Sequence, residues 1–552
     1  MKLTKVLPGL LVLFFCWISA LAAEIDADPG TLASANARAL AGDTVVLADG
    51  DYKTPIAPRH SGEPNRPIVF RAAARHKAVF SDPELDGAIQ LQARAFIVVE
   101  GIAARNMRRC IVSEGSHHVT VNDCFFNQAA TSSSWESCRF RECGDGIVFT
   151  NNQATGGNDL LAIWKGSNHR VEGNFFGDAS HTGLVLIGVQ RSIVRGNRFQ
   201  NRQWKCMEVF NCRDLPALLS RHNLIERNRF EYSPSSSIQY AGNDSILRRN
   251  IFWRTRAGME FAHYLGSART PEAWYNHGNR FYQNVIADCG SIALNNKLIA
   301  EAEKAGMKVA EPKYLEMAAY GLNFATNILD NDRPFGDQAI VNNILFRNGT
   351  GKGSGNCAAT VQVAFDWDST PNAATLFNNC IFGDGKPGAT LIYWMDAKPP
   401  QPKCQTLKEY EDRYPNSFAR NLEADPLFVN PDAGDFHLKP GSPCIDAGAF
   451  LTQADGAGEG TALSVKDARW FCDGFGIEGA AGDEIQLAGQ TVRVRIARVD
   501  YAKNVLTLAE PLKWTDGQGV SLAYAGKAPD AGAYESGVTE PAIPKPLPGS
   551  DK

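Results

Sequence analysis

SIVRGNRF, residues 192–199, returns in altered form along the middle of this chain. HRVEGNFF (169–176), NLIERNRF (223–230) and SILRRNIF (245–252) all place Phe two positions after Asn. A large apolar residue also follows Asn284, Asn343 and Asn379 at this distance. The shortest spacings, 174 to 197 and 228 to 250, give a unit of 22 or 23 residues, which is typical of one coil of a solenoid.

Short segments with alternating apolar residues lie between these asparagines, for example TGLVLIG (182–188) and KCMEVFN (205–211). Gly, Asn and Ser turns separate them, and no segment is a helix long enough for a βαβ crossover. We therefore predict an all-β solenoid of stacked parallel strands. Each Asn is expected to hydrogen-bond to its copies in the adjacent coils, while the following Phe or Ile fills the core.

Two terminal segments carry a family resemblance. ALAGDTVVLADGDYKTPIAPRHSGEPNRPIVFRAAARHKAVFSD (39–82) is followed by FIVVEGI, and DPLFVNPDAGDFHLKPGSPCIDAG (425–448) is completed by PDAGAYE (529–535). Together with the coils, they resemble the right-handed parallel β-helix of the pectate-lyase-like superfamily, especially chondroitinase-B-like and alginate-lyase-like secreted bacterial polysaccharide lyases. The resemblance implies a right-handed solenoid, but it indicates the fold better than the reaction.

The chain divides into five predicted parts. Residues 1–23 have two lysines, an apolar run and an A-x-A end, which is typical of a secretory signal peptide, so we expect a secreted or periplasmic protein. The β-helix is predicted over 24–450, with a helical excursion at about 297–326. Apolar and polar residues alternate within 451–526, which predicts a small inserted β-barrel or sandwich. Residues 527–538 are predicted to close the β-helix, and 539–552 to form a Pro-rich disordered tail.

Composition restricts the partners. A net charge of -4 gives no overall attraction to polyanions, so we expect no nucleic-acid partner, and no later apolar run is long enough to span a membrane. We expect a monomer. Cys138 with Cys143, and Cys206 with Cys212, are close enough in sequence to form disulfides, and buried free thiols are the alternative.

A polar strip is predicted on one outer face. Counting back ten residues from the Asn markers aligns Trp164, Ile187 and Tyr240 and directs them inward. Glu208, Gln239 and Glu260 then point outward from adjacent coils, about 4.8 Å apart. Such oxygen ligands suit Ca²⁺, for which we predict Glu208 and Glu260 as ligands, and a solvated polar face is the alternative.

Cationic and aromatic residues flank this strip, where they could bind a uronate through arginine pairs and ring stacking. The candidate catalytic residues are His181, Lys205 and Arg256. The candidate substrate-binding residues are Lys165, Arg202, Trp204, Arg221, Tyr232, Gln239 and His263.

The predicted function is cleavage of an acidic, uronate-containing polysaccharide by β-elimination. This reaction needs a cation or donors to neutralise the carboxylate, a base for the C5 proton and an acid for O4. In the lyases that this chain resembles, Lys and Arg take the acid and base steps. Two alternatives stay open, namely a glycoside hydrolase that uses Glu208 and Glu260, and a noncatalytic glycan-binding or adhesive surface protein.

Overall fold

The computed structural model describes residues 22–552 apart from 129–135, 213–218, 264–275, 327–334, 350–360, 368–373, 386–388, 395–396, 398–402, 540–542, 545–552 and most of 291–319. The predicted signal peptide and most of the predicted tail thus lie outside the described residues. Within them, no helix is long and apolar enough to cross a membrane.

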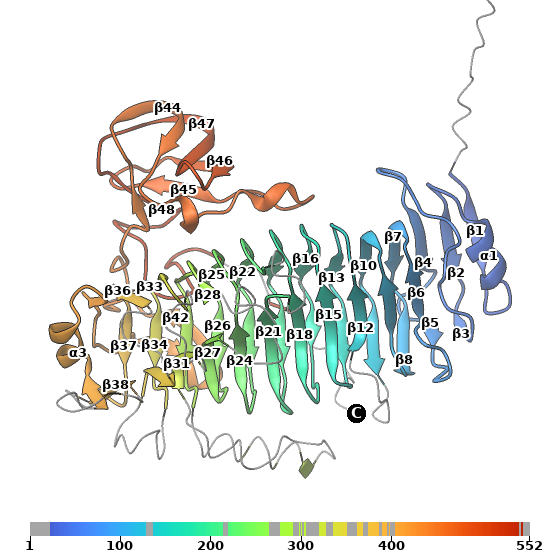
Figure 1. Cartoon of the computed structure of the whole chain (residues 1–552), viewed down its shortest axis with the longest axis horizontal. Coiled ribbons are helices and arrows are strands. Elements are labelled where there is room, and N and C mark those ends of the chain that lie inside the picture. Colours follow the sequence, from blue (N-terminus) through green and yellow to red (C-terminus); the bar gives the residue numbers. More distant parts are fainter. Residues whose placement is uncertain are drawn as a thin grey trace, which may run out of the picture.

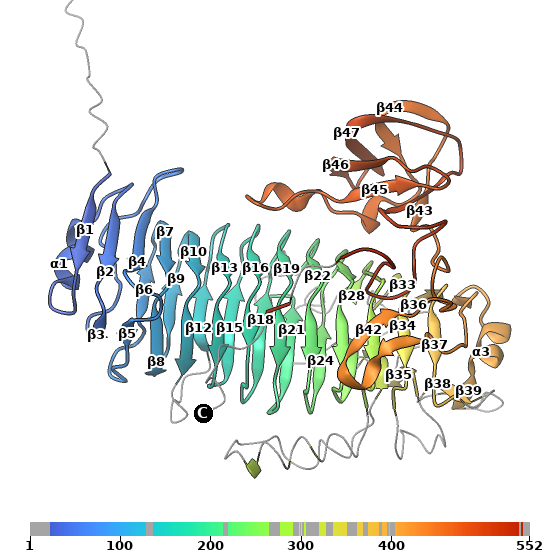
Figure 2. The ribbon, with the colours of Figure 1, turned by 180° about the vertical axis from the view of Figure 1, so that it is seen from behind.

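The described chain winds into a parallel β-helix with three long sheets, named here sheets A, B and C (Figure 1, Figure 2). Successive strands of each sheet pair in parallel, and the antiparallel pair β38–β39 ends sheet C. Most coils contribute one strand to each sheet in the order A, B, C. The predicted all-β solenoid is therefore confirmed.

Sheet A contains β1 (Glu24–Ala27), β2 (Thr44–Leu47), β4 (Ile68–Ala72), β7 (Ala95–Glu100), β10 (His117–Asn122), β13 (Val148–Thr150), β16 (Arg170–Glu172), β19 (Ile193–Arg195), β22 (Leu224–Glu226), β25 (Ile246–Arg248), β29 (Arg280–Tyr282), β33 (Gln338–Val341), β36 (Ala374–Phe377) and β40 (Phe418–Ala419). Sheet B contains β3 (Gly50–Tyr52), β5 (Ala78–Phe80), β8 (Ala103–Met107), β11 (Phe125–Gln128), β14 (Gln153–Thr155), β17 (Phe175–Phe176), β20 (Arg198–Gln200), β23 (Arg229–Glu231), β26 (Ile251–Trp253), β30 (Val285–Ala287), β34 (Ile344–Phe346) and β37 (Cys380–Phe382).

Sheet C contains β6 (Ile89–Gln92), β9 (Ile111–Glu114), β12 (Glu136–Arg141), β15 (Asp159–Trp164), β18 (Thr182–Ile187), β21 (Lys205–Phe210), β24 (Ser236–Tyr240), β27 (Ala257–His263), β31 (Tyr320–Thr326), β35 (Val363–Trp367), β38 (Thr390–Trp394) and β39 (Cys404–Thr406). Two short pairs accompany the solenoid, β28 (Asn276–His277) with β32 (Phe335–Gly336) and β41 (Phe428–Asn430) with β42 (Asp435–Leu438). The described α-helices are α1 (Leu32–Arg38), at the N-terminal end of the solenoid in Figure 1, and α3 (Leu407–Arg413).

The asparagine ladder joins sheet A to sheet B in each coil. The Nδ2 of Asn174 donates to Oδ1 of Asn197 at 2.9 Å, and Asn197 donates in the same way to Asn228 at 2.9 Å. The chain of bonds continues through Asn250, Asn284, Asn343 and Asn379 to Asn421. All seven predicted markers therefore stack in one column, and Asn421 extends it.

The apolar residue two positions after each of the seven predicted ladder asparagines lies in the core. Phe176, Phe199, Phe230 and Phe252 of this column form a continuous stack with Phe149 of β13, with ring centroids 4.8 to 6.2 Å apart. All five rings are fully buried. Stacked aromatic rings and amide ladders give every coil the same contacts to its neighbours, which fixes the parallel register.

Six antiparallel strands after the solenoid form a curled sheet, called here the C-terminal module. They are β43 (Thr452–Gln453), β44 (Gly458–Ser464), β45 (Glu484–Leu487), β46 (Arg493–Asp500), β47 (Val505–Trp514) and β48 (Gly519–Leu522). Figure 1 shows the module beside the solenoid, next to sheet A. Its core is continuous with Ile193, Leu224 and Ile246 on the outer face of that sheet.

Two sequence predictions need correction. Residues 320–326 were expected in the helical excursion but form β31, because Leu322 and Phe324 continue the inward columns of sheet C. The rest of that excursion lies mostly outside the described residues. Cys138, Cys143, Cys206 and Cys212 are buried free thiols, so neither of the two close pairs forms a disulfide.

Candidate active site on the outer face of sheet C

The outer faces of the three sheets differ in what covers them. The C-terminal module packs on sheet A, and the β41–β42 hairpin with residues 531–534 packs on sheet B through Phe428, Phe436 and Ala531. The outer face of sheet C instead carries a row of polar side chains. Glu208, Gln239, Glu260 and Asn323 are aligned on four successive strands, β21, β24, β27 and β31.

The predicted strip of Glu208, Gln239 and Glu260 is therefore in register, but the inward direction predicted for Trp164 and Ile187 is wrong. Glu208 pairs with Val185, which pairs with Ala162, so Leu184, Leu186, Leu161 and Ile163 face the core. The position aligned with Trp164 and Ile187 is Phe210, one residue beyond the position of Tyr240. The turn after Tyr240 is one residue shorter than the turns after β15 and β18. Counting the same number of residues back from each Asn marker therefore assigned the wrong face to β15 and β18.

Lys205 holds the strip together. Its Nζ lies 2.6 Å from Oε1 of Glu208 and 2.5 Å from Oε1 of Gln239 on the next strand. The second oxygen of Glu208 accepts a hydrogen bond from the Thr182 hydroxyl at 3.2 Å. Glu208 is only 4% exposed, so its charge needs this ammonium close by. Glu260 accepts a hydrogen bond from the Ser236 hydroxyl.

A histidine–aspartate pair lies next to this cluster. Nδ1 of His181 is 2.7 Å from Oδ1 of Asp159, and it also lies 3.1 Å from the Thr182 hydroxyl. Asp159 begins β15 and His181 immediately precedes β18, so the two residues come from adjacent coils. The Asp159 side chain is mostly buried, whereas the imidazole is about one-third exposed. Asp159 thereby orients the imidazole through Nδ1.

The pKa values follow from these contacts. Burial alone would lower the pKa of His181, but the hydrogen bond to Asp159 and the charge of Glu208 outweigh it and raise the pKa. Burial raises the pKa of Asp159, and the bond to His181 offsets this only in part. Burial would likewise raise the pKa of Glu208, but the charges of Lys205 and His181 outweigh it and lower the pKa. Glu208 is thus held as a carboxylate beside a more basic imidazole.

Three more predicted residues lie where the chain enters sheet C. Arg202 forms a bidentate contact with Asp178, in which Nη2 is 2.5 Å from Oδ2. The Trp204 ring lies 5.9 Å from the Lys205 ammonium. Arg256 immediately precedes β27, and its backbone N–H donates to the carbonyl of Ser233. The structure therefore brings His181, Lys205, Arg202 and Trp204 to the same edge of sheet C, with Arg256 two coils further on.

The remaining predicted residues lie elsewhere. Lys165 follows β15 at its far end and pairs with Glu142 at 2.6 Å, and Arg221 lies in the turn toward sheet A. His263 ends β27, and its side chain is outside the described part. Tyr232 contacts Trp253 on the sheet B side, with ring centroids 5.5 Å apart. These positions are separated from Lys205 by a whole strand or by a turn. The prediction grouped them because it followed their order along the chain and did not assign them to the three faces of a coil.

Sequence reasoning missed four residues of the cluster. Asp159, Thr182 and Ser236 begin strands of sheet C, and Asn323 continues the outer row. The Oδ1 of Asn323 is buried and accepts no hydrogen bond from any described residue. A correct alignment of the first residue of each strand would have found Asp159 and Thr182 as neighbours of Lys205.

The predicted Ca²⁺ ligands do not form a vacant oxygen cage. One oxygen of Glu208 contacts Lys205 and the other contacts Thr182, so a cation at this carboxylate would have to displace an ammonium. No group of three or more His, Cys, Asp or Glu residues in the described ranges could hold a metal ion. A Ca²⁺ ion at Glu208 would thus compete with Lys205, and the Ca²⁺ site stays a prediction.

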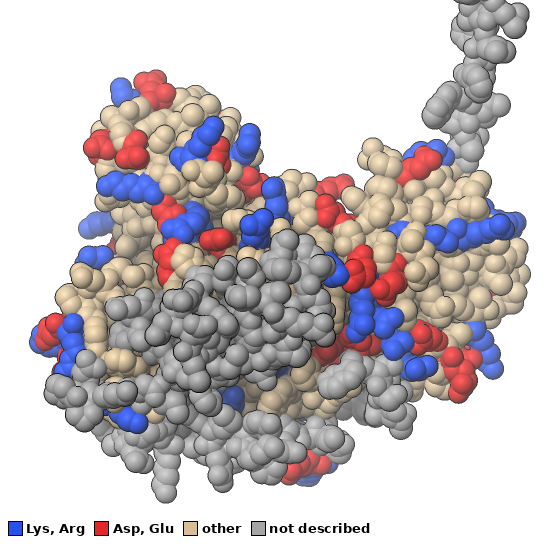
Figure 3. All heavy atoms as spheres, viewed as in Figure 1, with Lys and Arg blue, Asp and Glu red and all other residues tan. Residues whose placement is uncertain are grey.

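Charge over the rest of the described surface is mixed. Figure 3 shows acidic and basic side chains interspersed over the N-terminal coils and the C-terminal module. This agrees with the net charge of -4 and indicates that recognition of an acidic ligand must be local.

Comparison with known proteins supports the architecture. The model described as "Right handed beta helix region" matches residues 87–252. The solenoid is a right-handed parallel β-helix. No curated protein sequence matches the chain.

Several solved structures share this architecture at low identity. A mannuronic acid specific polysaccharide family 6 lyase from human gut microbiota is 16% identical, over 68% of this chain and 83% of that chain, with a TM-score of 0.42. XylC in complex with xylose is 11% identical over 90% and 99%, with a TM-score of 0.43. Pectate lyase Pel9A is 13% identical over 93% and 96%, with a TM-score of 0.35. The functional proposal therefore has to rest on the site itself.

Proposed function

We propose that this protein is an exported polysaccharide lyase that cleaves an acidic, uronate-containing polysaccharide by β-elimination on the outer face of sheet C. The observation that carries the proposal is the linked cluster in which Asp159 orients His181 beside the Lys205–Glu208 pair. It combines a basic imidazole, which can serve first as the base and then as the acid, with a cation that can neutralise the uronate carboxylate.

His181 is the proposed general base. Asp159 occupies Nδ1, so Nε2 takes the proton from C5 of the uronate. As the electron pair forms the C4=C5 double bond, the bond from C4 to O4 breaks. The same imidazolium then returns its proton to O4 of the leaving chain, so protons and electrons balance without a further reactant.

Lys205 is proposed to stabilise the charge that develops on the substrate. An ammonium has three donors, and Glu208 and Gln239 use two of them, so the third can donate to the uronate carboxylate. Arg256 adds a second cation on the same edge, and Trp204 offers an aromatic face to a sugar ring. The unpartnered Oδ1 of Asn323 would accept a sugar hydroxyl along the same row.

A glycoside hydrolase is the second candidate, and a specific observation favours it. The pKa of Asp159 is raised and that of Glu208 is lowered, which is the division between an acid and a base that hydrolysis by two carboxyl groups uses. We rank it second because Asp159 is already hydrogen-bonded to His181, so its proton is less available to a leaving group.

One assay separates the candidates. The purified protein is incubated with alginate, pectate, glycosaminoglycan and bacterial exopolysaccharide, with and without a chelator, while near-ultraviolet absorbance and reducing ends are followed. The lyase produces both signals, and loss of both in the chelator would reinstate a metal. Reducing ends without absorbance would establish the hydrolase. Saturable binding without either signal would establish the adhesive alternative.

Site variants test the assignment of roles. His181→Gln, Lys205→Ala and Arg256→Ala are expected to lower the rate of absorbance increase, with the largest loss for His181. If all three retain the full rate, the reaction class would stand and this cluster would not be the active site.

A further inference from the structure

A cleft lies where sheets A and B meet, on the ladder side of the solenoid and away from the outer face of sheet C. Its volume is about 900 Å³, and the β41–β42 hairpin and the closing segment around Tyr534 form its far wall. The lining includes five arginines, Arg195, Arg198, Arg227, Arg229 and Arg249, against the three carboxylates of Glu172, Glu231 and Asp435. The cleft is thus locally basic in a protein whose net charge is -4.

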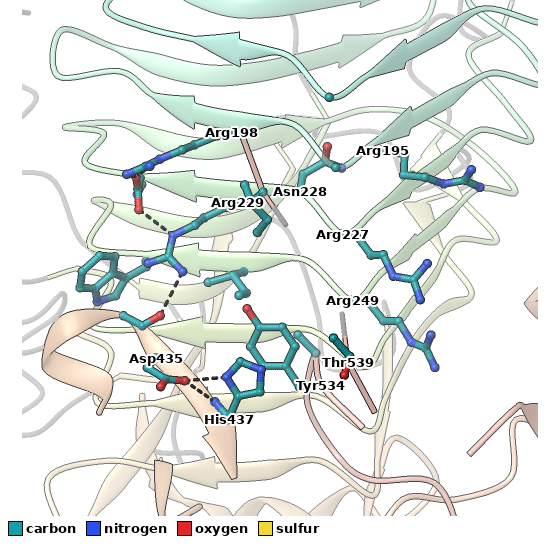
Figure 4. Close-up of a pocket in the computed structure, with 18 of the residues that line it drawn as sticks. Arg195, Arg198, Arg227, Asn228, Arg229, Arg249, Asp435, His437, Tyr534 and Thr539 are labelled. Atoms are coloured by element: carbon teal, nitrogen blue, oxygen red, sulfur yellow. Dashed lines mark hydrogen bonds and ion pairs between the residues drawn. The ribbon is translucent and has the colours of Figure 1, made fainter. Parts of the chain in front are cut away.

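The arginines are ordered by the coil repeat. Arg227 and Arg249 immediately precede ladder asparagines Asn228 and Asn250, and both have positive φ, 52° and 53°. Figure 4 shows Arg195, Arg227 and Arg249 pointing to the same side from three successive coils. Arg227 and Arg249 occupy equivalent positions on adjacent coils, about 4.8 Å apart along the solenoid axis. Arg195 is aligned one position earlier, with Glu226, and pairs with that carboxylate at 2.5 Å.

Arg198 and Arg229 form a second group of arginines, which is held by contacts to both the solenoid and the hairpin. Arg198 and Arg229 share the fully buried Glu231, at 2.6 and 2.7 Å, and Arg229 also donates to the carbonyl of Gly434 in the hairpin. The Arg229 guanidinium lies 4.9 Å from the centre of the Trp253 ring. These contacts hold the wall of the cleft rigid, which lowers the entropy lost on binding.

An aromatic platform completes the cleft. The rings of His437 and Tyr534 stack with centroids 4.0 Å apart, and Asp435 holds His437 at 2.6 Å (Figure 4). A flat ring surface beside several guanidinium groups matches the chemistry of a sugar chain that carries carboxylates, because rings stack on aromatics and arginine pairs with carboxylates.

We propose that this arginine cleft is a second binding groove for an acidic polysaccharide, separate from the active site on sheet C. The assignment rests on the residues of the cleft and shares only the ligand class with the proposed function. Because the two faces are different, one long polymer can engage both while a short fragment reaches one. Long chains are then retained through effective concentration.

Binding of a long polyuronate by the full-length protein tests this inference. His181→Gln is the background, so that the polymer is not cut, and polygalacturonate and alginate are the probes. Arg227→Gln with Arg249→Gln is expected to weaken binding at least tenfold. The matched control, Arg108→Gln with Arg420→Gln, removes the same two charges at exposed positions outside the cleft and is expected to retain binding.

Equal affinities of the two double variants would overturn the groove, as would equal binding of neutral dextran or of single-stranded DNA. A fall in affinity for the cleft variant alone would support the groove even if no polymer is cleaved. Should the double variant misfold, nitration of Tyr534 in the unmodified protein gives a second readout. Bound polyuronate is expected to protect this ring, and unchanged nitration would refute the groove.

Discussion

Arg248 and Asp483 are 235 positions apart in sequence, yet they form a buried bidentate ion pair in which Nη1 lies 2.7 Å from Oδ2. Arg248 also donates to Glu226 on the adjacent coil at 2.7 Å and to the Tyr282 hydroxyl at 2.9 Å. A single guanidinium therefore joins the C-terminal module to sheet A and pairs with two buried carboxylates, one of which, Glu226, is also paired with Arg195.

Replacement of this arginine should loosen the module. Arg248→Met leaves Glu226 and Asp483 buried without their shared cation, so we expect the free energy of unfolding to fall by about 3 to 5 kcal/mol. Chemical denaturation measures this, and limited proteolysis should cut between 452 and 522 sooner. Arg495→Met is the control, because Arg495 pairs with Glu484 at 3.8 Å on an exposed surface. Equal stability of the two variants would contradict the role of Arg248.

His181 should set the pH dependence of the reaction. A general base must be deprotonated, so the rate should rise with pH through the His181 pKa, which lies above its usual value of 6.5. Asp159→Asn removes the interaction that raises this pKa, so the rising limb should move to lower pH while the maximal rate falls. His76→Gln, far from sheet C, is the control. An unchanged pH profile in Asp159→Asn would exclude His181 as the base.

Lys205 and Glu208 should be coupled in stability. Lys205→Met leaves Glu208 buried and unpaired, and the cost is expected to be about 3 kcal/mol. Adding Glu208→Gln removes the charge and should restore much of the stability, while activity stays lost. Thermal denaturation of both single variants and the double variant gives the coupling energy. Additive losses would indicate that the two side chains do not interact.

Asn228 tests the ladder. Its Oδ1 accepts hydrogen bonds from the backbone and side chain of Asn197, and its Nδ2 donates to Asn250 and to the carbonyl of Val194. Asn228→Ala leaves several buried groups without partners, so we expect a loss of about 2 to 4 kcal/mol in denaturation. Asn151→Gly is the control, because Asn151 is exposed and glycine accepts its φ of 55°. A loss no larger than that of the control would refute the ladder's energetic role.

Glu535 should make the protein less stable at higher pH. Burial raises the pKa of this carboxyl to about 7, from a usual value of 4.5. The folded state therefore binds a proton more tightly than the unfolded state. Its contribution is fully present below about pH 4.5 and is lost as the pH rises through 7, at a cost on the order of 3 kcal/mol. Melting temperatures between pH 5 and 8 should fall, and Glu535→Gln should flatten this fall. A parallel decline in both proteins would assign it to other groups.

Sequence reasoning predicted the solenoid because the ladder repeats a chemical requirement that is visible in every coil. Asn197 and Phe199 have the same neighbours as Asn228 and Phe230, so one local pattern reports a global arrangement. The strip of Glu208, Gln239 and Glu260 was predicted from the alternation within β21, β24 and β27, because each of these three residues stands between two fully buried apolar residues.

The details of the site depend on turns, which carry no such repeat. One residue fewer after Tyr240 was enough to reverse the predicted faces of β15 and β18, because strand side chains alternate with a period of two. Asp159 was missed because its partner His181 is 22 positions away, and only the stacking of coils makes the two residues neighbours. The arginine cleft needs the hairpin wall, whose Gly434 is 205 positions from Arg229.

The distance between neighbouring ladder asparagines does not depend on how many residues separate them in sequence. Asn250 and Asn284 are 34 positions apart and Asn284 and Asn343 are 59 apart, yet the side-chain bonds measure 3.0 and 2.9 Å. Segments inserted into the turns around sheet C can therefore grow, shrink or be exchanged without moving the neighbouring coils. Evolution can alter the rim of the polar strip while the geometry of the strip stays constant, and loop grafting offers the same freedom to the protein engineer.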